Sequence, residues 1–182
     1  CAGCSITDGN YNSFVGSLAG RANTTGTQNV AVGYAAFCSN TTGIYNTAIG
    51  AGGVMYQNTS GSYNVAIGFE TMLQPSGVNE TTAVGYRALR SLTTGCQNTA
   101  LGTCTLHNTT TGRDNTAVGC KALVSNTSGG YNTAVGNQAL LNNTTGITNI
   151  AIGGGALISN NTASKNTAVG FSSLSTNTTG YE

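Results

Sequence analysis

The sequence predicts an all-β fold: a parallel β-solenoid, or β-roll, of about ten 17-residue coils over residues 12–182, after a partial repeat at residues 1–11. One unit, close to Asn-Thr-Ala-Val-Gly-x-x-Ala-Leu-x-x-Asn-Thr-Thr-Gly-x-x, recurs, and eight of its nine spacings are 17 residues. So short a fixed period is typical of stacked repeats. Two glycines per unit, with many Thr, Asn and β-branched residues, favour short strands over helices. The units begin at Asn12, Asn29, Asn46, Asn64, Thr81, Asn98, Asn115, Asn132, Asn149 and Asn166.

The elements of each unit are predicted in order from its positions. Positions 2–4 form a first short strand, with alanine usual at position 3 and an aliphatic residue always at position 4, from Val15 to Val169. The invariant glycine at position 5 supplies a bend that a Cβ would obstruct. Positions 6–9 are predicted as a second strand, and Asn-Thr-Thr-Gly at positions 12–15 as the closing turn. Coils stacked about 4.8 Å apart give a rod of roughly 48 Å.

The strand at positions 2–4 must place neighbouring side chains on opposite faces. We assign the aliphatic residue at position 4 to the interior, which turns the alanine at position 3 outward. Positions 6 and 7 vary freely while this alanine does not, which predicts close approach of another chain; recent duplication of one unit is the alternative explanation. The core is also thin for a lone rod, so we expect a homotrimer or a fibre. The predicted interface comprises Ala31, Ala48, Ala66, Ala83, Ala100, Ala117, Ala134, Ala151 and Ala168.

Six cysteines in a chain with 6% charged residues indicate an oxidising, extracellular or surface location. Cys104 stands at position 7 and Cys120 at position 6 of the next unit, within disulfide reach if the coils stack. These two form the predicted disulfide. The other four, Cys1, Cys4, Cys38 and Cys96, are left to pair between chains or with one another.

Asn-x-Ser/Thr sequons recur near position 12 and predict one of two arrangements. Exposed turns of this kind accept N-glycans in secreted proteins. Stacked asparagines can instead form a hydrogen-bonded ladder. The candidates are Asn23, Asn40, Asn58, Asn79, Asn108, Asn126, Asn142, Asn143, Asn160 and Asn177.

The composition argues against several other functions. The formal net charge is +1 and there is no basic stripe, so nucleic acid is not an expected partner. No apolar run is long enough to span a membrane. The acidic residues lie in different units and His107 is the only histidine, so we expect no enzyme, no metal and no cofactor. Covalent N-glycans are the one attached group that the sequons allow.

The units at residues 115–129 and 132–146 resemble the head repeats of trimeric autotransporter adhesins and, more closely, repeats of phage tail-fibre-like surface proteins. The resemblance covers residues 12–182 and implies a left-handed parallel β-roll, commonly trimeric, with the small-residue strand at the three-chain interface. The six cysteines and dense sequons depart from bacterial heads. No binding residues carry over.

The main functional expectation is a structural segment of an extracellular fibre or surface appendage, assembled from copies of itself. The chain begins inside a unit and stops at a unit boundary, so we expect it to be a portion of a longer array. Two alternatives remain open. One is an adhesin or tail-fibre head that binds surface glycans or matrix through residues such as Tyr34 and Tyr86. The other is an ice-binding solenoid that uses the threonines frequent at position 2.

Overall fold

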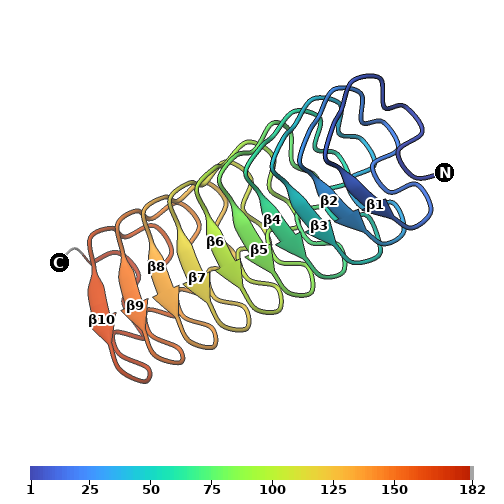
Figure 1. The fold of residues 1–182 in the computed structure, drawn as a ribbon. Helices are drawn as coiled ribbons and strands as arrows, with labels where there is room; N and C mark the ends of the chain where they lie inside the picture. Colours follow the sequence, from blue (N-terminus) through green and yellow to red (C-terminus); the bar gives the residue numbers. More distant parts are fainter. Residues whose placement is uncertain (181–182) are drawn as a thin grey trace.

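The computed structural model describes residues 1–180, and in that range it is a parallel β-solenoid without a helix, as predicted. The coils stack into a rod with the first and last strands at its opposite ends (Figure 1). Each coil contributes one three-residue strand, and the strands are β1 (Ser13–Val15), β2 (Val30–Val32), β3 (Thr47–Ile49), β4 (Val65–Ile67), β5 (Thr82–Val84), β6 (Thr99–Leu101), β7 (Thr116–Val118), β8 (Thr133–Val135), β9 (Ile150–Ile152) and β10 (Thr167–Val169).

The strands form one parallel sheet in sequence order, β1 to β10. Equivalent positions pair throughout, as Ala117 pairs with Ala134 and Val118 with Val135. Beyond the strand, the N–H of the position-5 glycine continues the ladder to the preceding coil, as from Gly136 to the carbonyl of Val118 at 2.8 Å. Side chains of one kind therefore form continuous rows along the rod.

The interior is lined by the alanines at position 3, so the predicted orientation of the strand is wrong. Ala117 and Ala134 are completely buried, whereas the aliphatic residues at position 4 are on the outside of the sheet. The reason lies across the coil, where the large residue at position 9, such as Leu123 or Leu140, is also completely buried. A narrow coil has room for one large side chain, so the facing strand must present a small one.

The predicted oligomer interface is therefore wrong as well. Because these alanines lie inside their own coil, they cannot touch another chain. All nine are at most 3% exposed: Ala31, Ala48, Ala66, Ala83, Ala100, Ala117, Ala134, Ala151 and Ala168.

The second predicted strand, at positions 6–9, is also wrong. These residues form turns in which positions 7 and 9 have positive φ, as at Arg87 (55°) and Leu89 (51°). The coils remain hydrogen-bonded here, from Arg87 N to Phe69 O and from Leu89 N to Thr105 O, both at 3.0 Å. These intercoil bonds offset the cost of the left-handed backbone and curl the chain around the core.

Candidate functional site

Asparagine at position 1 forms a buried ladder along the rod. The amide oxygen of Asn132 accepts from the backbone N–H and the side-chain Nδ2 of Asn149, at 2.9 and 3.1 Å. Its own Nδ2 donates to Asn115 Oδ1 at 3.2 Å and to the Gly146 carbonyl at 2.9 Å. A carboxylate could not donate, so among side chains of this size only an amide makes all four of these hydrogen bonds.

A second buried ladder, at position 12, contains most of the predicted glycosylation sites. Asn143 donates from Nδ2 to Asn126 Oδ1 and to the Gly146 carbonyl, and accepts from Asn160 Nδ2, at 3.0–3.1 Å. A glycan cannot attach to an amide buried in this way in the folded rod. The prediction is therefore wrong for the six completely buried sequons, Asn23, Asn40, Asn58, Asn126, Asn143 and Asn160.

The remaining sequons differ in how their amides are used. Asn177 is partly buried and donates to Asn160 Oδ1. Asn79, Asn108 and Asn142 are exposed. Asn79 accepts from the Ser62 N–H, and Asn108 contacts the ring of His107. Asn142 has no side-chain hydrogen bond to residues 1–180, which makes its amide the most accessible of the ten candidates.

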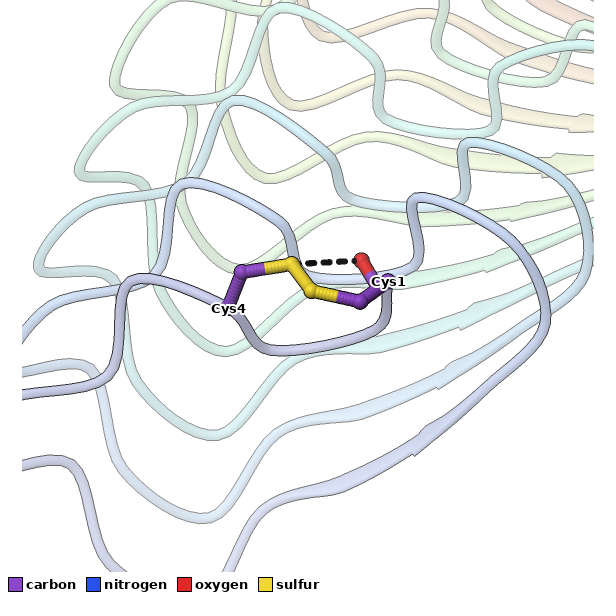
Figure 2. Close-up of a disulfide and its surroundings, with 2 residues drawn as sticks. All are labelled: Cys1 and Cys4. Carbon is purple, nitrogen blue, oxygen red and sulfur yellow. Dashed lines mark hydrogen bonds between the residues drawn. A yellow bond between two sulfur atoms is a disulfide. The ribbon is translucent and has the colours of Figure 1, made fainter.

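The disulfide lies at the N-terminal end and is not the predicted one. Cys1 and Cys4 are bridged, with Cα atoms 5.8 Å apart (Figure 2). This pairing is one of the arrangements that the sequence left open. The predicted partners Cys104 and Cys120 both carry free thiols in the described chain, as do Cys38 and Cys96. The backbone φ is positive at position 7, as at Cys104, but not at position 6, as at Cys120. Side chains at these two positions therefore leave the coil in different directions.

The free thiols should react in the order of their exposure. When native protein is treated with a maleimide, we expect Cys120 to be modified first and buried Cys38 only on unfolding. Peptide mass mapping after timed quenching would follow each site. If Cys104 and Cys120 both resisted labelling until a reductant was added, the disulfide predicted between them from the sequence would be present after all.

The side of the sheet that faces away from the core is an uncharged surface of aliphatic, threonine and serine side chains. We call the side chains at positions 2 and 4 the outer sheet face. Leu101 and Ile152 on it are 37% and 40% exposed, and the values reach 60% at Val15 and 66% at Val169, on the first and last strands. The face comprises Ser13, Val30, Thr47, Val65, Thr82, Thr99, Thr116, Thr133, Ile150 and Thr167 at position 2, and Val15, Val32, Ile49, Ile67, Val84, Leu101, Val118, Val135, Ile152 and Val169 at position 4.

Exposed aromatic residues border this face on both sides along the chain. Position 17 carries Tyr11, Tyr45, Tyr63 and Tyr131, and position 6 carries Tyr34, Phe69, Tyr86 and Phe171. Where neighbouring coils both carry an aromatic residue the rings stack, as for Tyr45 and Tyr63 with centroids 5.1 Å apart. Tyr34 and Tyr86, the residues predicted for glycan binding, are both exposed, and Arg87 lies over the ring of Tyr86.

One cluster of charged side chains links two neighbouring coils at the surface of the rod. Glu70 Oε2 accepts from Arg87 Nε at 2.8 Å and from Arg90 Nε at 2.9 Å, joining the β4 coil to the β5 coil. The hydrogen bond from Arg90 lowers the pKa of Glu70 below its ordinary value of 4.5; partial burial opposes this shift and the hydrogen bond from Arg87 adds to it.

In the part of the chain that the structure describes, few polar side chains line a recess that could hold a ligand. A shallow groove of about 520 Å³ near the C-terminal end is lined by hydroxyl and amide groups, including Ser125, Asn142, Thr144 and Ser159. These groups can donate and accept hydrogen bonds to a polar ligand but include no titratable acid or base. Among residues 1–180 no three potential metal ligands come together. That same range contains no helix that is long and apolar enough to cross a membrane.

Comparison of the chain with protein-family models, with characterised proteins and with solved structures finds no match. By its structure the protein is a single-sheet β-solenoid. Its candidate functional site is the outer sheet face.

Proposed function

We propose that the protein is a structural segment of an extracellular fibre and assembles with copies of itself through the outer sheet face. The observation that carries this proposal is the unbroken uncharged face, which is formed by aliphatic and Ser/Thr side chains on all ten strands. Large exposed apolar patches on soluble proteins are typical of interaction surfaces. The Cys1–Cys4 disulfide supports an oxidising, extracellular location.

The size of the face is adequate for a stable interface. Ten strands about 4.8 Å apart, and six residues from one aromatic row to the other, give a surface on the order of 900 Å². A standard interface uses about 800 Å² per partner, with tyrosine enriched and charged residues depleted at its centre. The outer sheet face and its aromatic borders have this composition.

The periodicity of the face favours a second copy as the partner. Val118 and Val135 are equivalent neighbours, and the same step recurs along the whole sheet. Their β-branched side chains are stiff and form ridges with the period of the coils. An identical sheet has the same period, so its ridges stay in register along the full rod, as they do where two sheets pack about 10 Å apart. A partner without this repeat would fit over only a few coils.

Charge placed on the face should prevent assembly without unfolding the coil. For Val118→Glu with Val135→Glu we expect a monomer where the parent forms oligomers or fibres, because two carboxylates per chain would be buried unpaired. Light scattering and electron microscopy would measure this, with circular dichroism as the check on folding. The matched control is Ser128→Glu with Thr145→Glu, which adds the same charge to the same coils at exposed turn positions.

The control is expected to assemble like the parent. A parent protein that stays monomeric at micromolar concentrations, or a face variant that assembles normally, would refute the proposal.

Ice binding is the second candidate for the same face. The observation in its favour is that threonine at position 2 faces outward from a regular sheet, as at Thr116 and Thr133, although Val30, Val65 and Ile150 interrupt the row. Thermal hysteresis of a dispersed preparation is the test. Hysteresis that disappears in the Val118→Glu and Val135→Glu variant would favour ice binding, and none in the parent would exclude it.

A further inference from the structure

Both interior ladders are interrupted in the same stretch of the rod. At position 1, Thr81 replaces asparagine, and its hydroxyl accepts from the Asn98 N–H at 3.4 Å, where the intact ladder has 2.9–3.1 Å. At position 12 the three coils of β4, β5 and β6 carry Pro75, Leu92 and Thr109. Between Asn58 and Asn126 the second ladder retains one side-chain bond, from Asn126 Nδ2 to Thr109 Oγ1 at 3.4 Å. Residues 64–109 lack most of the amide bonds that join the other coils.

The same stretch has ion pairs between coils, which the other described coils lack. Arg87 and Arg90 of the β5 coil both reach Glu70 of the β4 coil. The ring of Phe69 stacks on Tyr86 across this junction, with centroids 5.8 Å apart. The remaining ion pair in residues 1–180, Arg113 with Asp114, joins adjacent residues of one coil. Within the described residues 1–180, ionic links between coils thus occur only where the interior ladders are broken.

We infer that residues 64–109 are the segment of the rod that opens most easily. Glu70, Arg87 and Arg90, which we call the surface clamp, hold its coils together in place of the missing ladder contacts. When the clamp is neutralised, the coils open first at the junction between β4 and β5. Acid and high salt are the conditions that release it, because the buried amide ladders elsewhere carry no charge.

The acid dependence follows from the groups around Glu70. The β5 coil presents Arg87 and Arg90 to it, and the equivalent position of the preceding coil is Gly52, which has no ionisable side chain. Because the folded-state pKa of Glu70 is depressed, its contribution is present above the ordinary value of 4.5 and is lost as the pH falls through the folded value.

Hydrogen exchange on the full chain tests the inference. For Glu70→Gln at pH 7 we expect amides at the junction, such as Arg87 N–H and Met72 N–H, to exchange roughly fivefold faster, the change that loss of a charged network of about 1 kcal/mol produces. Amides of β8 and β9 should keep their rates. The matched control is Asp114→Asn, which removes the same charge from a carboxylate that joins no second coil.

A second arm uses the unmodified protein, so the test does not depend on the variant folding. Raising NaCl to about 1 M, where screening acts within about 3 Å, should reduce protection at residues 64–109 and leave β8 and β9 unchanged. Equal protection along the whole parent rod, an unchanged profile in Glu70→Gln, or a uniform loss of protection over all coils would overturn the inference.

Discussion

Replacing Asn143 with alanine is expected to lower the free energy of unfolding by about 2–4 kcal/mol, whereas replacing its neighbour Asn142 should change it by less than about 0.5 kcal/mol. Asn143 bridges Asn126 and Asn160 in the buried ladder. Without it, the Asn126 oxygen loses its side-chain donor in a site that water cannot reach, and the unpaired buried group carries the cost. The side chain of Asn142 points into solvent and has no partner to lose.

Denaturant unfolding of protein made in a host without N-glycosylation would compare the two variants. The pair also separates the two explanations of the sequons. If glycans decorated the folded rod at position 12, intact mass of native material would show sugar on Asn143. The ladder predicts that any sugar at this pair is on Asn142. Equal unfolding energies for the two variants would show that the ladder contributes little.

Asn142 and Asn143 show why the sequence could not assign the sequons. Both satisfy the same three-residue pattern, and both belong to a turn rich in Asn and Thr. The difference lies in tertiary position: one amide stacks on the equivalent amides of the next coils, and the other is one residue too early in the turn. The periodic signal was present, because the buried sequons keep a 17-residue spacing, as Asn126, Asn143 and Asn160 do.

The period predicted the stacking and the register of the strands, but not which side of the strand faces inward. Because side chains alternate along a strand, Ala117 and Val118 must lie on opposite faces, but alternation does not say which of the two faces inward. The usual preference of protein interiors for larger apolar side chains favours Val118 as the buried residue. The uniformity of the alanine was the better guide, because it indicates a tight steric limit, and Leu123 opposite it imposes that limit from inside the coil.

The turns at positions 6–9 could not be predicted from propensity. Arg87 and Leu89 adopt positive φ although neither residue favours it. Each is held by a backbone bond to an adjacent coil, and such a bond exists only after the coils have stacked. Local sequence therefore predicts a strand at positions where tertiary contacts produce a turn.

Replacing Gly119 with alanine is expected to lower the free energy of unfolding by about 2–6 kcal/mol. A Cβ at this position would lie 2.5 Å from the carbonyl oxygen of Gly136, and φ is +127°. The first effect forces apart two backbones that the sheet holds together, at a typical cost of about 1–3 kcal/mol or more. The second adds backbone strain of about 1–3 kcal/mol.

Two further glycines separate these contributions. Gly170 has a similar φ of +124°, but its Cβ would meet nothing closer than 4.0 Å, so Gly170→Ala should show the backbone strain alone. Gly154 has no positive φ and a nearest contact at 3.4 Å, so Gly154→Ala should be close to neutral. Thermal unfolding of the three variants would rank them. A Gly119→Ala loss no greater than that of Gly170→Ala would mean that neighbouring coils do not approach as closely as stacked position-5 glycines require.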